Sequence, residues 1–193
     1  MQIQRMNFLY SLWNRPYLLT LAIGILLGLS FPPFPFPFLQ IPALLLLYRL
    51  AEITPGKRQA VFYSTIAFVI WNTITTYWMT FATMAGGIAA ILANSLVMTV
   101  PFLIMRHALR SSRPFWIKAA IVTAAWLSFE FLHHHWDLAW PWLTLGNGWS
   151  NAVAIIQYVS VTGILGVSAW MLLSTIFLYG WLSGPAAAAR YKW

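Results

Sequence analysis

The sequence has no cysteine among its 193 residues and very few charged residues. The missing thiols exclude a disulfide framework, a thiolate-bound zinc site, an iron–sulfur cluster and a cysteine nucleophile within this chain. Only 3 residues are acidic and 11 are basic, so charged side chains make up 7% of the sequence, against roughly 25% in ordinary soluble domains. So few charges cannot cover the surface of a water-soluble protein.

The composition is dominated by apolar residues, with 61% hydrophobic and 17% aromatic side chains. An aromatic content of this size excludes a disordered chain. The net charge of +8 would favour a nucleic-acid partner in a soluble protein, but the basic residues stand in clusters between long apolar intervals. We therefore interpret the chain as an all-α, polytopic membrane protein with one membrane domain and no nucleic-acid partner.

The basic residues also predict the topology. Three intervals, 16–48, 59–105 and 119–189, contain no Lys or Arg. Each is long enough for two crossings, and the positive-inside rule then places both termini and the two basic loops in the cytoplasm. We expect six spans at about residues 17–31, 38–51, 60–81, 87–109, 115–134 and 161–182.

The boundaries of this domain follow from the spans. Residues 17–182 are expected to form the membrane domain, with residues 1–16 and 183–193 as cytoplasmic segments. Four prolines within 31–38 cannot continue a helix and predict an outer turn. A second, tight outer turn is expected over residues 82–87.

Two further features of the spans carry predictions. Pro101 is expected to kink the fourth span, because proline removes a backbone hydrogen bond within a helix. Gly24 and Gly28, four residues apart in the first span, permit close packing against another helix.

The three acidic residues are informative because they are so few. Glu52 stands near Arg49 and Lys57, which favours a solvated ion pair in an inner loop. Glu130 falls inside the fifth span, about one turn below its outer end. A carboxylate costs roughly 2.5–3.5 kcal/mol at the bilayer centre, so we expect Glu130 to have a partner. Two interpretations stay open: a polar anchor hydrogen-bonded to the following loop, or a functional contact with a lipid headgroup or a partner domain.

The run His133, His134, His135 and Asp137 resembles a metal-binding motif only in composition. Consecutive helical residues point in different directions, so at most two of these side chains share a face, whereas metal sites need three or four ligands. We expect no metal site and interpret the histidines as interfacial polar caps. Nucleotide-binding and hydrolase motifs are also absent from the sequence, and we expect no cofactor.

The outer segment 135–157 is rich in tryptophan: four of the 12 tryptophans fall between residues 136 and 149. Tryptophan prefers the headgroup region of a membrane. Pro141 and the Gly146-Asn147-Gly148 run disfavour a regular helix here. The segment is either an interfacial loop lying flat on the bilayer or a shaped aromatic platform with a groove for acyl chains.

Three motifs follow one another with informative spacing. They are Gly28-Leu-Ser-Phe-Pro-Pro-Phe, then Tyr77-Trp78 with Gly86-Gly87, then Trp126-x-x-x-Glu130-Phe-Leu followed by Trp140-Pro141-Trp142-Leu143-x-x-Gly146. In order, spacing and topology they resemble the N-terminal membrane portion of the bacterial apolipoprotein N-acyltransferase family, over about residues 16–182.

The resemblance implies a role in lipoprotein maturation. The family transfers an acyl chain from a phospholipid to the α-amino group of the diacylglyceryl-cysteine of an apolipoprotein, at the outer face of the bacterial inner membrane. The resemblance also implies that the reaction passes through a cysteine thioester. The cysteine lies in a nitrilase-like domain that also supplies a Glu and a Lys. In this chain there is no cysteine, residue 193 comes before any such domain, His133 replaces the family's arginine and Trp140 its phenylalanine. We expect no catalytic residue here and no catalysis by this chain alone.

Two hypotheses follow. In the first, the chain is the membrane half of an N-acyltransferase, either truncated or completed by a separately encoded nitrilase-like catalytic domain. The residues expected to shape a lipid and lipoprotein platform beneath the active site are then Trp78, Glu130, Trp140, Pro141, Trp142, Gly146 and Asn147. In the second, the chain is a non-enzymatic membrane scaffold that binds lipid or lipoprotein.

Overall fold

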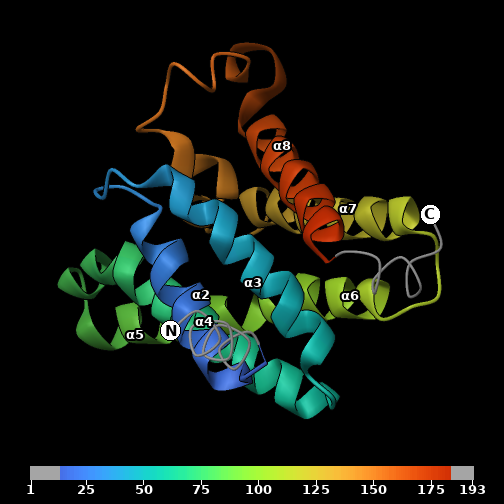
Figure 1. The fold of residues 1–193 in the computed structure, drawn as a ribbon. Helices are drawn as coiled ribbons and strands as arrows, with labels where there is room; N and C mark the ends of the chain where they lie inside the picture. The colour runs from blue at the N-terminus through green and yellow to red at the C-terminus, as the bar shows by residue number, and fades with distance from the viewer. Residues whose placement is uncertain (1–13, 184–193) are drawn as a thin grey trace, which may run out of the picture.

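The computed structural model describes residues 14–183, and this part of the chain is helical with no β-strand. The α-helices are α2 (Pro16–Leu29), α3 (Gln40–Ile53), α4 (Lys57–Thr76), α5 (Met84–Val97), α6 (Thr99–Leu109), α7 (Phe115–His134) and α8 (Val159–Leu182) (Figure 1). Short 3₁₀ helices are η1 (Pro37–Leu39), η2 (Tyr77–Phe81), η3 (Pro141–Leu143) and η4 (Leu145–Trp149). Of the two expected cytoplasmic segments, residues 1–13 and 184–193 lie outside the described part.

Three helical stretches are long and apolar enough to cross a membrane. They are Met84–Leu109, which joins α5 and α6, Phe115–His134 and Val159–Leu182, with 26, 20 and 24 residues. Helix α2 is also apolar but has only 14 residues, and α3 has the same length. At 1.5 Å per residue, helices this short do not reach across a 30 Å hydrocarbon core without their flanking turns. The all-helical fold is therefore confirmed, with three stretches in the described part of the chain that could cross a membrane.

Local sequence signals explain most helix boundaries. Pro16 occupies the first turn of α2, where its missing N–H costs nothing, and Pro114 precedes α7 in an extended conformation. Helix α7 has the predicted bounds. The prediction for residues 82–87 was wrong in extent: the turn ends at Thr83, and Gly86 and Gly87 lie in the first turn of α5. The glycine pair suggested a turn, but the extended backbone of Thr83 ends the connection and α5 begins at Met84.

The helix that contains Pro101 is interrupted at one residue, three positions before the proline, while the predicted kink stays a prediction. Helix α5 ends at Val97 and α6 begins at Thr99, with Met98 between them. In a continuous helix the Val97 carbonyl would accept the N–H of residue 101, which proline does not have. The interruption therefore falls where the missing hydrogen bond predicts it.

Close packing of α2 against α4 depends on the two glycines. A Cβ atom on Gly24 would lie 2.6 Å from Ile70 Cβ and 2.7 Å from the Ala67 carbonyl oxygen, and one on Gly28 would lie 2.7 Å from Ile74 Cδ1. Backbone contact of this kind maximises dispersion between helices in lipid, where the hydrophobic effect does not drive association. The packing predicted from the Gly24 and Gly28 spacing is confirmed.

Aromatic side chains fill the centre of the bundle. The Phe68 ring is 6.3 Å from Trp71, 6.3 Å from Phe102 and 6.2 Å from Trp126, between ring centroids. These four rings come from α4, α6 and α7 and are all buried. Helix α3 packs on both α6 and α8, and α6 lies beside α7, so one core joins all the helices (Figure 1).

The connections gather at two opposite ends of the bundle. At one, which we call the aromatic end, the segments 31–38, 77–81 and 135–157 meet; Asn151 Nδ2, for example, donates to the Phe34 carbonyl at 3.0 Å. At the other, the basic end, the turns 54–56 and 110–114 meet, with the Arg106 guanidinium donating to the carbonyls of Thr54 and Pro55 at 2.9 Å each. The chain thus runs back and forth between an aromatic end and a basic end.

Glu52 lies at the basic end but not in a solvated loop, so that prediction was wrong. It belongs to the last turn of α3, and its carboxylate is mostly covered. Its Oε2 accepts a hydrogen bond from the Tyr179 hydroxyl at 2.6 Å and lies 3.7 Å from Arg49 Nη1. The ion pair with Arg49 is present, while Lys57 begins the next helix on the exposed surface. Packing of α8 against α3 covers the carboxylate, which local sequence could not show.

The glycine contacts yield a stability prediction. We expect Gly24→Ala to destabilise the fold by about 1–3 kcal/mol, because the added methyl group must push α4 away from α2. This loss outweighs the gain of roughly 1 kcal/mol in helix propensity. The measurement is thermal unfolding in detergent. Gly56→Ala is the matched control, since a Cβ there meets nothing within 4 Å; equal midpoints for the two variants would contradict the packing.

Candidate functional site

The seven residues predicted for the platform all lie at the aromatic end. Glu130 comes from the last turns of α7 and Trp78 from η2. The other five belong to segment 135–157, in or directly before η3 and η4: Trp140, Pro141, Trp142, Gly146 and Asn147. The structure divides them into two groups. One group shapes the backbone of segment 135–157 and consists of Glu130, Pro141, Gly146 and Asn147. The other group consists of the three tryptophans, whose rings pack together.

Glu130 fixes the segment to α7. Its carboxylate is buried, and Oε1 accepts hydrogen bonds from the Leu145 backbone N–H at 2.8 Å and from Trp126 Nε1 at 3.0 Å. Oε2 makes no hydrogen bond of good geometry, although the Ser168 hydroxyl is close enough to interact with this carboxyl group. Of the two interpretations left open by the sequence, the anchor to the following loop is confirmed.

The carbonyl of the same residue, Leu145, is bound by Gln40, which the sequence did not single out. Gln40 Nε2, at the start of α3, donates to the Leu145 carbonyl at 2.9 Å. Its Oε1 accepts from Trp149 Nε1 at 2.8 Å. Glu130 and Gln40 therefore satisfy the backbone N–H and the carbonyl of one buried residue, Leu145, as buried backbone requires. The only available signal was a lone glutamine directly after the proline-rich turn.

Gly146 brings the segment against α8. Its N–H donates to the Ser168 hydroxyl at 2.9 Å, and a Cβ atom there would lie 2.6 Å from the Ile164 carbonyl oxygen. The turn before it is closed by two donors to the Pro141 carbonyl, Asn147 Nδ2 at 2.8 Å and Thr144 Oγ1 at 2.9 Å. A residue larger than glycine would separate the segment from α8.

Two exposed tryptophans, Trp78 and Trp142, form the surface of the platform, with the buried Trp140 packed against Trp142. The ring centroids of Trp78 and Trp142 lie 5.6 Å apart in a T-shaped arrangement, and those of Trp140 and Trp142 are also 5.6 Å apart and T-shaped. Trp140 is buried, whereas Trp78 and Trp142 are 41% and 44% exposed. Edge-to-face pairs of this kind rigidify large aromatic surfaces. Trp78 and Trp142, 64 residues apart in sequence, thus act as one wall.

Beside this wall is a groove of about 290 Å³. Its lining is mainly apolar, from η2, α5 and the start of segment 135–157, and includes Met79, Ala90, Val97, Leu138, Trp140 and Trp142. Three polar side chains also reach it, Asn94, His133 and Asp137. A smaller hollow behind it is bordered by Glu130 and shares Asn94, His133 and Trp140 with it. The groove combines a long apolar wall with a few polar groups.

The polar part of the groove begins a buried chain of hydrogen bonds. His133 Nε2 donates to Asn94 Oδ1 at 2.6 Å, Asn94 Nδ2 donates to Asn72 Oδ1 at 2.7 Å, and Asn72 Nδ2 donates to the Phe68 carbonyl at 2.9 Å. Polar side chains inside an apolar bundle are costly, so full pairing is expected. The two asparagines were missed, although amides within the third and fourth spans were a usable signal.

The three histidines have separate partners. His134 Nε2 donates to Thr144 Oγ1 at 2.6 Å, and His135 Nδ1 donates to the Phe131 carbonyl at 2.6 Å, while His133 binds Asn94. In the described part of the chain, no group of three or more His, Asp or Glu residues could hold a metal ion. The histidines connect the end of α7 to different neighbours.

The fold and the groove together define a class: a helical membrane domain with an aromatic-walled groove at one end. Comparison with known proteins identifies the family. The family described as the apolipoprotein N-acyltransferase N-terminal domain matches residues 23–184, and the chain belongs to this family.

Curated relatives agree with this assignment. The chain is 30% identical to the apolipoprotein N-acyltransferase of Chlorobaculum tepidum, over 88% of this chain and 32% of the relative. It is 25% identical to that of Nitrosomonas europaea and 26% identical to that of Geobacter metallireducens, over 83% and 90% of this chain and 34% and 35% of those relatives. The chain thus spans about a third of their length. No solved structure matches it significantly.

The anchor makes a testable prediction. Glu130→Ala removes the acceptor of two buried donors, so we expect destabilisation of roughly 2–3 kcal/mol and faster deuterium exchange of the peptide containing Leu145. Glu130→Gln keeps an acceptor oxygen and should retain most protection. Asp137→Ala, at an exposed acid on the same segment, is the matched control. Unchanged exchange at Leu145 in Glu130→Ala would disprove the anchor.

Proposed function

We propose that the chain is the N-terminal membrane domain of an apolipoprotein N-acyltransferase-like enzyme of the bacterial inner membrane. In this role the enzyme transfers an acyl chain from a phospholipid to the N-terminal diacylglyceryl-cysteine of a lipoprotein. The part played by this chain is to bind the lipid portions of the substrates at the aromatic end. The groove beside Trp78 and Trp142 carries the proposal, together with the family match.

The lining of the groove suits an amphiphile. Its mainly apolar wall removes acyl-chain surface from water, with each buried CH₂ worth about 0.8 kcal/mol. Asn94, His133 and Asp137 provide donors and acceptors for the polar part of the same molecule. Binding sites for small molecules commonly combine an apolar lining with a few placed polar groups.

Catalysis is proposed to reside outside these 193 residues. The chain has no cysteine to form a thioester, and it corresponds to about a third of its relatives. A nitrilase-like domain, joined to this chain or encoded separately, would supply the Glu, Lys and Cys that the resemblance implies. Glu130 is not a substitute, because its carboxylate is buried and holds the Leu145 peptide.

We propose a six-span topology for residues 17–182, with the basic end in the cytoplasm and the aromatic end outside. Arg49, Arg106, Arg110 and Lys118 gather at one end, as the positive-inside rule requires of the cytoplasmic side. The platform tryptophans gather at the other, where an interfacial position suits their rings and N–H groups. The short helices α2 and α3 would cross together with their flanking turns.

Because the sequence has no native cysteine, single cysteines test this topology directly. Ser112→Cys and Ser150→Cys lie on exposed turns at the basic and the aromatic end. In intact spheroplasts we expect a membrane-impermeant maleimide to label Ser150→Cys at least tenfold more than Ser112→Cys, and permeabilisation to equalise them. Preferential labelling of Ser112→Cys would invert the proposed orientation.

Platform function is tested by reconstitution. The chain is combined with the catalytic portion of the Chlorobaculum tepidum relative, and N-acylation of a diacylglyceryl peptide is measured. We expect Trp142→Ala and Trp78→Ala to lower kcat/KM about tenfold, because each removes roughly 1.5–3 kcal/mol of apolar contact. Trp116→Ala is the matched control, at an exposed tryptophan of the basic end.

The outcomes separate the two hypotheses. Activity that falls in the platform variants and not in Trp116→Ala supports the membrane half of an acyltransferase. Activity that is unchanged in all three variants removes the platform. If the combined proteins bind the lipid but transfer no acyl chain, the non-enzymatic lipid-binding scaffold replaces the enzyme.

A further inference from the structure

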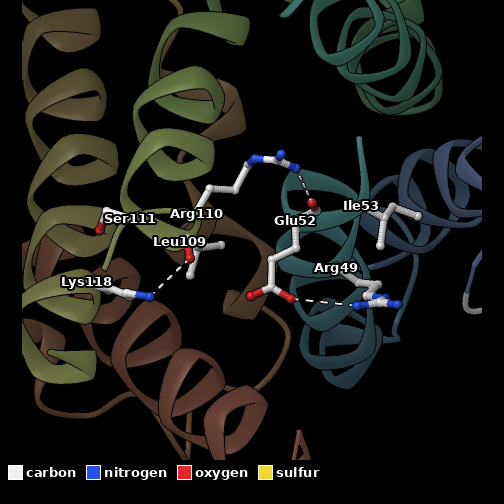
Figure 2. Close-up of a pocket in the computed structure, with 7 residues that line it drawn as sticks. All are labelled: Arg49, Glu52, Ile53, Leu109, Arg110, Ser111 and Lys118. Atoms are coloured by element: carbon white, nitrogen blue, oxygen red, sulfur yellow. Dashed lines mark hydrogen bonds and ion pairs between the residues drawn. The ribbon is translucent and has the colours of Figure 1, made fainter. Parts of the chain in front are cut away.

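A second cavity lies at the basic end, far from the platform. Its volume is about 620 Å³, and it opens between the ends of α3 and α6 and the beginning of α7 (Figure 2). The residues that line it are Arg49, Glu52, Ile53, Leu109, Arg110, Ser111 and Lys118. Unlike the groove at the aromatic end, this cavity is lined mostly by charged and polar groups.

Three cations and one carboxylate face this cavity, which leaves an excess of two positive charges. The single carboxylate is already engaged, since Glu52 Oε2 accepts from the Tyr179 hydroxyl and lies 3.7 Å from Arg49. Arg49, Arg110 and Lys118 together outnumber this carboxylate, and Figure 2 shows Arg110, directly after α6, and Lys118 of α7 beside the cavity.

Lys118 is the most unusual of these cations. It is 1% exposed, yet it carries an ammonium group that is costly to bury unless it is paired. Nζ donates to the Leu109 carbonyl at 3.2 Å, at the C-terminus of α6. Arg110 Nη1 donates similarly to the Glu52 carbonyl at 2.6 Å, at the C-terminus of α3. Carbonyl groups at the ends of α6 and α3 thus position both cations beside the cavity.

In the proposed topology, the cavity lies near the cytoplasmic interface of the membrane. Trp116, near the start of α7, and Trp181, near the end of α8, are 64% and 74% exposed at the same end of the bundle. Exposed tryptophans at helix ends are typical of the membrane interface. Basic pockets between membrane helices at this level bind the headgroups of anionic lipids.

From these observations we propose that the cavity at the basic end binds a phosphate group, supplied by the headgroup of an anionic phospholipid, through Arg110 and Lys118. Guanidinium and ammonium groups form charge-assisted hydrogen bonds to phosphate oxygens. This site is separate from the proposed acyl transfer, because it lies at the opposite end of the bundle and uses none of the platform residues. It would make the stability of the domain depend on lipid charge.

The test measures lipid binding to the 193-residue chain in detergent by native mass spectrometry. Phosphatidylglycerol, phosphatidylcholine and inorganic phosphate are the three probes. We expect phosphatidylglycerol to bind more tightly than phosphatidylcholine, and Arg110→Gln and Lys118→Gln each to weaken it about fivefold. Arg113→Gln is the matched control, since it removes the same charge from an exposed residue that does not line the cavity.

A variant that is expected to bind more tightly distinguishes the proposed site from a loss of binding caused by misfolding. Glu52→Gln removes the only carboxylate of the cavity and should tighten phosphatidylglycerol binding severalfold. Equal affinity for the two lipids, or equal losses in Arg110→Gln and Arg113→Gln, would overturn the proposal. Saturable binding of inorganic phosphate alone, lost in Arg110→Gln and Lys118→Gln, would support the phosphate site and identify a free anion instead of a lipid as its ligand.

Discussion

The aromatic end depends on how the backbone N–H and carbonyl of a single residue, Leu145, are hydrogen-bonded. Segment 135–157 has too little regular structure to satisfy its own backbone, yet part of it is buried among α3, α7 and α8. Glu130 accepts the Leu145 N–H and Gln40 donates to its carbonyl, so side chains from two helices replace the missing backbone partners. Because this peptide is fixed, Gly146 can approach α8 and Trp142 can reach Trp78. Burying the Glu130 carboxylate costs free energy, and the hydrogen bonds by which it orders segment 135–157 offset this cost.

Sequence patterns predicted the helices well, but they predicted poorly which side chains form hydrogen bonds between distant segments. The apolar intervals located α7 at its observed bounds, and Pro101 and the glycines at 24 and 28 gave the helix break and the close contact with α4, because these effects act within one helix or through a missing side chain. Gln40 and Asn94 were missed, since their roles depend on partners 105 and 22 residues away. Glu52 was placed in solvent for the same reason: only the fold reveals that Tyr179 covers it.

The residues of the predicted site also divide into those found by local arguments and those whose role depends on the fold. Glu130 was singled out because an acid within a span needs a partner, which is a local energetic argument. The tryptophans were singled out by composition, and their assembly into one wall required Trp78 from a distant segment. The resemblance to a family supplied Trp78, which composition alone would not have chosen. By contrast, the hydrogen-bonded chain from His133 through Asn94 to Asn72 follows from pairing across three helices, and no short motif encodes it.

The two ends of the bundle carry cavities with different linings. At the aromatic end, rigid rings leave an apolar groove with few polar groups, which suits a ligand that is mostly hydrocarbon. At the basic end, the C-termini of α3 and α6 attract Arg110 and Lys118, because helix C-termini carry partial negative charge. Together with Arg49 these cations outnumber the single carboxylate of the cavity, so the same interactions that cap two helices also leave an excess of positive charge there. The proposed phosphate site is thus a consequence of how the helices end, and it requires no residue beyond those that the fold already holds in place.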